Sequence, residues 1–202
     1  MGLFDYFRRK PRVRTASDLA DFIDGNSAFL AQKALYEYSR ARSGHYSKVL
    51  FAEPEFQKAV EHSRWRAFPL GLAMVAEAVD SVLRAQPNAE GRRDSDALVA
   101  VVLSVFDRYS VPETLGEEAW RELRADLERR LRSIGLHPPK RAMDIPATYA
   151  QSYFELMPIH EKLRGRDFPT THNYLMVSLC NIHDELTRRI EGRPLAEMPG
   201  VS

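Results

Sequence analysis

The stretch "GEEAWRELRADLERRLRSIG" at residues 116–135 decides the fold class, because it has the features of a long amphipathic helix. Acidic residues near its start and arginines near its end complement the helix dipole. Gly135 follows the last apolar residue, so we expect it to end the helix in the left-handed conformation. Five apolar side chains recur at helical spacing and form one stripe: Trp120, Leu123, Leu127, Leu131 and Ile134.

The same helical period recurs along most of the chain. It is found in residues 26–43, 53–86, 94–109, 147–163 and 170–190. Asn26 is expected to cap the first of these helices, and Pro54 to occupy the first turn of the second. No period of about 20 to 50 residues repeats three times, which argues against a solenoid.

Some helix boundaries stay open at this level. Pro69 either kinks one long helix or separates two, and Pro158 either kinks or ends a later one. The apolar run "ALVAVVLSVF" at residues 97–106 is rich in valine, as strands are. Its length and the caps Asp94 and Ser95 favour a central helix instead.

We therefore predict one irregular all-α domain of about six to eight helices at residues 15–192. It is expected to end in an antiparallel helix hairpin, because a short break at residues 167–169 separates its last two helices. A basic, aromatic arm at residues 1–14 precedes the domain, and a loose tail at residues 193–202 follows it.

The composition excludes some partner classes. The 202 residues include 29 basic and 28 acidic side chains, so a nucleic-acid partner is not expected. Cys180 is the only cysteine, which rules out an internal disulfide and a cysteine-rich zinc site and fits a reducing compartment. No apolar run approaches the roughly 18 residues that span a bilayer, and no secretory signal is recognisable, so the expected location is the cytoplasm.

The N-terminal arm, "MGLFDYFRRKPRVR", combines apolar rings with a cluster of cations. In a helix, its apolar side chains would share one side. Such a segment suits an anionic membrane surface, here the inner face, or an acidic partner protein. The alternative is that the rings pack back on the domain. The candidate contact residues are Leu3, Phe4, Phe7, Arg8, Arg9 and Lys10.

A second candidate contact surface is "HSRWRAFP" at residues 62–69, the densest aromatic and basic cluster in the chain. Trp65 lies opposite the apolar stripe of its own helix. The helix is therefore either buried between neighbours, or Trp65 forms a contact surface with Arg64 and Arg66. Tryptophan and arginine are typical anchors of protein interfaces.

Two similar phrases, "ELMPIHEKLRGR" and "SLCNIHDELTRR", place His160 and His183 at matching positions. The helical rise puts these two histidines roughly 13 Å apart along the hairpin, too far for a shared metal. His172 is level with His160 near the turn, where Glu161 and Asp167 make them a weak metal-site candidate.

A cavity is the other hypothesis for these histidines. His172 and His183 share one face of the last helix, with Tyr174 nearby, so they could look into a cavity that binds a ligand. The alternative is that they are hydrogen-bonded structural residues. Cys180 could contact His183, but nothing in the sequence supplies the orienting group of a Cys–His nucleophile.

The sequence contains no Gly-rich phosphate loop, G-x-S-x-G, H-E-x-x-H or paired E-x-x-H motif. The favoured function is a non-enzymatic helical module that binds a protein partner, in an assembly, adaptor or regulatory role. No cofactor is predicted, and the sequence sets no oligomeric state. The alternative is a helical enzyme or a metal- or cofactor-binding protein with a cavity near His160, His172 and His183.

Overall fold

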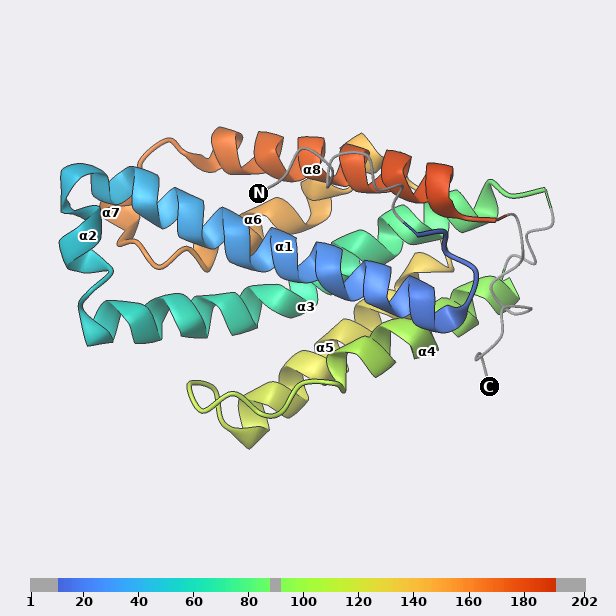
Figure 1. Cartoon of the computed structure of the whole chain (residues 1–202), viewed down its shortest axis with the longest axis horizontal. Helices are drawn as coiled ribbons and strands as arrows, with labels where there is room; N and C mark the ends of the chain where they lie inside the picture. Colours follow the sequence, from blue (N-terminus) through green and yellow to red (C-terminus); the bar gives the residue numbers. More distant parts are fainter. Residues whose placement is uncertain (1–10, 88–91, 192–202) are drawn as a thin grey trace.

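The computed structural model describes residues 11–87 and 92–191 of the chain. In this part the fold is all-α (Figure 1), as predicted, and its one isolated β-bridge joins Val13 to Ile190. The elements in chain order are α1 (Ala16–Ser43), η2 (Gly44–Tyr46), α2 (Ser47–Leu50), α3 (Pro54–Arg84), α4 (Arg92–Phe106), α5 (Glu117–Ile134), η3 (Ala142–Asp144), α6 (Pro146–Glu155), α7 (Glu161–Arg164) and α8 (Phe168–Arg189).

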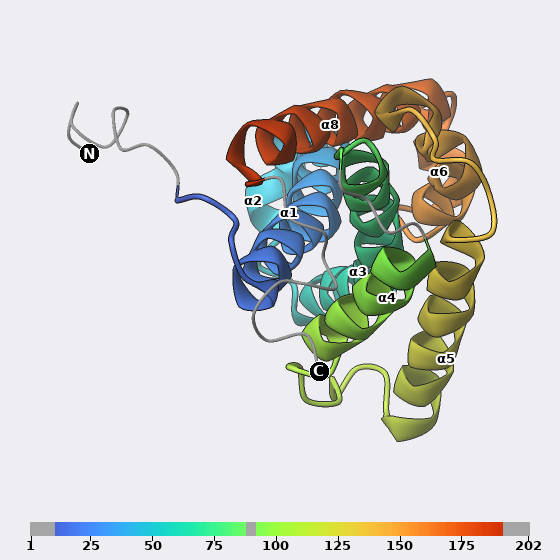
Figure 2. The same cartoon turned by 90° about the vertical axis from the view of Figure 1, so that its right-hand side faces the viewer.

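Helix α3 is the centre of the domain. It packs most extensively on α1, and also on α4, α5, α6 and α8, which surround it in the end-on view of Figure 2. As a result, all residues from 67 to 80 of α3 are buried. Pro69 lies inside this helix, so the segments before and after the proline belong to one long helix and are not separated by it.

Helix α1 begins earlier than predicted. The expected cap, Asn26, is inside the helix, where its Nδ2 donates to the carbonyl of Phe22 at 2.8 Å. The true start is a capping box. The Thr15 hydroxyl accepts from the Asp18 N–H, and the Asp18 carboxylate accepts from the Thr15 N–H, both at 3.0 Å. The prediction was wrong because Asn26 fits a cap equally well by residue type.

Helices α4 and α5 follow the sequence, with one correction. Residues 97–106 are helical, and α5 covers the predicted amphipathic stretch. Gly135, however, has a φ of −65° and is not left-handed. A Cβ on Gly135 would lie 3.0 Å from the Cβ of Ser95, so close packing of α5 on α4 explains the glycine.

The segment before α8 differs from the predicted helix at residues 147–163. Helix α6 ends at Glu155, before Pro158, and α7 has only four residues. His160 precedes α7 and caps it, because its Nδ1 accepts from the Lys162 N–H at 3.2 Å. The estimate of helix height that placed His160 level with His172 therefore does not apply. Helix α6 itself packs against α8.

The chain before α1 lies against the end of α8. Val13 is fully buried, and Arg14 donates to Glu191 at 2.9 Å. The contact residues predicted in the arm and the tail at residues 193–202 lie outside the described residues. Among the described helices, none combines the length and apolar character that a membrane span requires.

Candidate functional site

Residues 62–69 of α3, the aromatic and basic cluster of the sequence, contribute to the lining of four surface pockets. Two of these pockets adjoin on the side of α3 that faces α5, and we call them the α3–α5 groove. The other two adjoin on the side that faces α1, and we call them the α1–α3 groove. The cluster is therefore the place where these four pockets meet.

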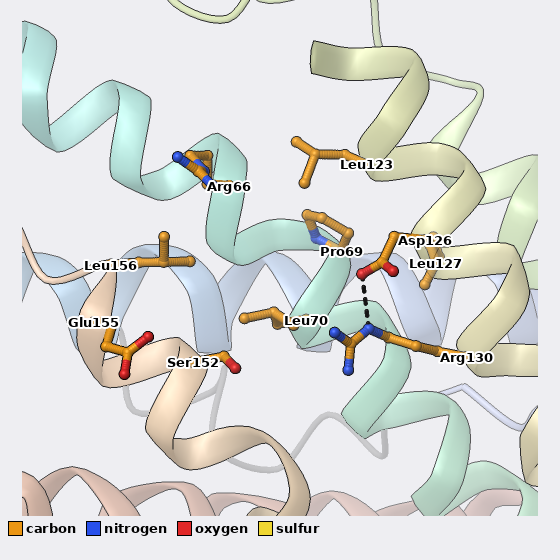
Figure 3. A pocket seen from close by; sticks show the side chains of 10 residues that line it. All are labelled: Arg66, Pro69, Leu70, Leu123, Asp126, Leu127, Arg130, Ser152, Glu155 and Leu156. Atoms are coloured by element: carbon orange, nitrogen blue, oxygen red, sulfur yellow. Dashed lines mark hydrogen bonds and ion pairs between the residues drawn. The ribbon is translucent and has the colours of Figure 1, made fainter.

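The α3–α5 groove has pockets of about 270 and 610 Å³. Figure 3 shows the smaller pocket, where α6 closes one side through Ser152, Glu155 and Leu156. The two pockets share Arg66, Leu123 and Asp126.

The α3–α5 groove is lined by charged side chains, of which some are paired with each other. Arg130 donates to Asp126 at 2.9 Å, and Arg129 also pairs with this carboxylate. Burial by itself would raise the pKa of Asp126, but the two arginines lower it on balance. Arg66 is exposed and makes no hydrogen bond or ion pair within the described residues. The groove thus offers one unpaired cation beside an internally paired carboxylate.

The α1–α3 groove is more apolar. Its pockets measure about 120 and 410 Å³ and share Gln32 and Arg64. Besides these two, its lining consists of Ala28, Ala31, Leu35, Tyr36, Phe51, Gln57, Val60, Glu61, Trp65, Phe68 and Tyr109. Large apolar linings with a few polar groups are typical of binding sites.

Trp65 is half-buried at the inner wall of the α1–α3 groove. Its ring makes edge contacts with Phe68, Tyr109 and Trp120, at centroid distances of 6.2, 5.5 and 5.8 Å. The Arg64 guanidinium stacks on the Trp65 ring at 4.7 Å, and the Arg64 Nε is buried without a hydrogen-bond partner. Of the two alternatives drawn from the sequence, burial applies to part of the Trp65 side chain, and the contact surface stays a prediction.

Tyr109 holds one end of the same groove in place. Its hydroxyl donates to Asp24 at 2.7 Å, and Arg108 pairs with Asp24 and Asp21. Burial and the contact with Asp24 raise the pKa of Tyr109 to about 12, so it stays protonated at neutral pH. This network ties the segment just after α4 to α1 and holds the Tyr109 ring at the wall of the groove.

The buried half of α3 carries two carboxylates. Glu77 accepts from the Tyr149 hydroxyl at 2.6 Å and pairs with Lys140 at 2.9 Å. Burial raises the pKa of Tyr149, and the neighbouring Glu77 raises it further. Lys140 belongs to the segment between α5 and η3, so this pair ties that segment to α3.

Asp80 is the second buried carboxylate. It lies 3.0 Å from Arg84 and accepts from the Ser95 hydroxyl at 3.2 Å. Arg84 also donates to the carbonyls of Ile134 and His137 at the end of α5. Burial raises the pKa of Asp80 although Arg84 opposes this shift. Neither Asp80 nor Glu77 lines one of the four pockets, and their contacts join helices, so we assign them a structural role.

The histidines of the alternative hypothesis lie apart from the grooves. His160 is an exposed cap, His172 is half-buried against the ring of Phe168, and His183 is half-buried 3.4 Å from Asp184. None of them lines the four pockets. In residues 11–87 and 92–191, no group of three or more His, Cys, Asp or Glu side chains could hold a metal ion.

The remaining candidates near α8 have separate environments. Asp167 is engaged by Arg42 and by the Tyr38 hydroxyl, which donates to it at 2.9 Å. The Tyr174 hydroxyl is buried without a hydrogen-bond partner. Glu161 is exposed on α7, and Cys180 is a half-buried free thiol.

No family model, curated protein or solved structure matches the chain. The sequence singled out Arg64, Trp65 and Arg66, and all three line a groove. The sequence did not single out Tyr36, which looks like an ordinary apolar residue of its helix, or Phe51, which follows α2 in a turn. Only the packing of α1 against α3 places them at one site.

Proposed function

We propose that the protein is a non-enzymatic helical interaction module that binds an apolar segment of a partner protein in the α1–α3 groove. The observation that carries this proposal is the lining itself, in which Tyr36, Phe51 and Trp65 surround Arg64. Tyrosine, tryptophan and arginine dominate the binding energy of protein interfaces. An assembly, adaptor or regulatory role fits such a site.

The shape of the groove suits a helix of the partner. The lining on α1 extends from Ala28 to Tyr36, which is about 12 Å along the helix axis, or roughly two turns. Tyr36 remains 45% exposed, so the groove opens onto the surface. A partner helix can place apolar side chains from successive turns into such a groove.

Arg64 supplies the polar part of the recognition. Its guanidinium stacks on Trp65 and makes no hydrogen bond or ion pair within the described residues. A carboxylate on the partner would therefore meet a preoriented cation, and charge-assisted hydrogen bonds are the stronger kind. We infer a partner segment with apolar residues on one face and an acidic residue beside them.

Site-specific photo-crosslinking in the cells that produce the protein tests this proposal. A photoreactive residue at Gln32 is expected to capture a partner, whereas one at Arg121, an exposed position on α5 that lines none of the four pockets, is expected to capture none. The captured partner is then identified, purified and titrated with the full-length chain.

Two matched substitutions decide the outcome. Arg64→Ala is expected to weaken the purified complex about 30-fold, whereas Arg121→Ala leaves its Kd unchanged. Thermal melting by circular dichroism checks that both variants fold. Equal crosslinking at both positions, or a Kd that Arg64→Ala does not change, would contradict the proposal.

A further inference from the structure

One end of the bundle combines basic charge with exposed apolar side chains. We call it the basic tip and define it as residues 40–50 and 161–167, which include η2, α2 and α7 and lie at one end of the long axis in Figure 1. It contains six basic and two acidic residues, a surplus of four, in a chain whose net charge is +1. Next to it, Glu53 precedes α3 and Glu55 lies in the first turn of α3, where Lys58 pairs with Glu55 at 3.2 Å.

The two segments of the basic tip are tied together by one side chain. Arg42, at the end of α1, donates to the carbonyl of Arg164 at 3.1 Å and forms an ion pair with Asp167. These contacts hold α7 beside the end of α1, next to α2. The remaining cations of the tip that make no ion pair within the described residues are Arg40, Lys48, Lys162, Arg164 and Arg166.

The apolar side chains of the tip are unusually exposed. Tyr46 is 78% exposed, Leu163 66% and Val49 61%, and only Leu136 at 68% falls among them in the described part of the chain. None of the three lines one of the four pockets. These three side chains are therefore exposed away from the concave sites described above, which a folded partner would need for close packing.

We propose that the basic tip docks on an anionic lipid bilayer. Tyr46, Val49 and Leu163 would enter the headgroup region, and the exposed cations Arg40, Lys48, Lys162 and Arg166 would contact lipid phosphates. Protruding apolar side chains suit a fluid interface that adapts to their shape, and tyrosine favours the headgroup level. Each basic residue near such a surface strengthens binding about fivefold.

The basic tip lies away from the point where the described chain begins and outside the lining of the α1–α3 groove. Val13 pairs with Ile190 at the far end of α8, whose 22 residues span about 33 Å. The described chain therefore begins at the opposite end of the bundle from the basic tip (Figure 1). The groove runs along the side of the bundle, so docking through the tip leaves it accessible to a protein partner.

Vesicle flotation with the full-length protein tests this inference. Wild-type protein is expected to float with vesicles of phosphatidylcholine and phosphatidylserine, more strongly at low salt, and not with phosphatidylcholine alone. Lys48→Glu/Lys162→Glu is expected to weaken this partition at least about 20-fold. Tyr46→Ser/Val49→Ser/Leu163→Ser is expected to weaken it about tenfold.

Control variants outside the tip show whether a change in flotation is caused by the tip itself. Leu136→Ser removes an equally exposed apolar side chain outside the tip, and Arg121→Glu reverses a charge on α5; neither is expected to change the partition. Phe4→Ser/Phe7→Ser reports the contribution of the arm. The inference is overturned if wild-type protein does not float with anionic vesicles at low salt. It is also overturned if the arm variant abolishes flotation while both tip variants float like wild type.

Discussion

The two halves of α3 belong to one continuous helix but have opposite surroundings. Residues 67–80 are all buried, whereas residues 54–66 include one buried residue, Ser63. The buried half contains two carboxylates, and the other half contributes most of the groove lining that α3 supplies. Apart from these two carboxylates the buried half is apolar, so along α3 burial follows both the polarity of the residues and the number of neighbouring helices.

The neighbours explain the contrast. Five other helices pack around α3 as a whole, and they converge on its second half (Figures 1 and 2). The first half has α1 on one side and α5 on another, which leaves a groove on each side. Pro69 lies where the two halves meet, and because it lacks an N–H, the carbonyl of Trp65 has no helical donor.

The largest expected effect compares two phenylalanines on either side of this boundary. Phe68→Ala removes a buried ring and is expected to lower the free energy of unfolding by about 3–5 kcal/mol. Phe56→Ala removes a half-buried ring in the other half, with an expected loss of about 1 kcal/mol. Urea denaturation of both variants measures the difference. Equal losses would show that the two halves are equally packed.

The ion pairs of the two halves should differ almost as much. Arg84→Met leaves buried Asp80 without a cation and the end of α5 without two donors, with an expected loss of about 3 kcal/mol. Lys58→Met removes the exposed pair with Glu55, with an expected loss below about 0.5 kcal/mol. Chemical denaturation at neutral pH and moderate salt measures both.

The Arg84 prediction has an internal control. Because burying an unpaired charge causes most of the loss, Asp80→Leu in the Arg84→Met background is expected to restore part of the stability. A double variant that is as unstable as the sum of the two single variants would show that the carboxylate and the arginine act independently.

Two glycines are expected to respond with opposite signs. A Cβ on Gly71, in the buried half of α3, would lie 3.0 Å from the carbonyl oxygen of Ser27, so Gly71→Ala should destabilise the fold by about 1–2 kcal/mol. Gly25 in α1 has nothing within 4 Å, so Gly25→Ala should stabilise it by about 0.5–1 kcal/mol. Thermal melts compare the two. A stabilised Gly71→Ala variant would mean that the α1–α3 crossing can widen.

The smallest expected effect is a pH dependence with opposite signs for two aspartates. Because burial raises the pKa of Asp80 above 3.8, its ionisation costs stability as pH rises through the raised pKa. A hydrogen bond from Arg124 lowers the pKa of Asp107, so the stability from that contact is present above 3.8 and is lost as pH falls through the lowered pKa.

Urea midpoints measured against pH for wild type, Asp80→Asn and Asp107→Asn check these signs. Relative to Asp80→Asn, wild type should lose stability as pH rises above 3.8. Relative to Asp107→Asn, wild type should lose stability as pH falls below 3.8. Parallel curves for the three proteins would contradict both assignments.

Parts of the fold and of the site could be predicted because their signals are local. Helix α5 is encoded by its own stripe and terminal charges, and residues 62–69 were recognisable from aromatic and basic composition. The start of α1 was also readable, since Thr15 and Asp18 form the capping-box pattern. The end of α6 at Glu155 was not, because a proline three residues later is compatible with either a kink or an end.

The sequence by itself determined that the chain is all-α and where most of its helices lie. It also identified residues 62–69 of α3 as an aromatic and basic cluster. These properties depend on hydrogen bonds and side-chain spacing within a few turns. Only the tertiary structure decided that Glu77 and Asp80 are buried, that Tyr36 and Phe51 join Trp65 in one groove, and that α2 and α7 form one basic end. Those properties depend on which helix surfaces meet across the chain, and local periodicity does not specify such pairings.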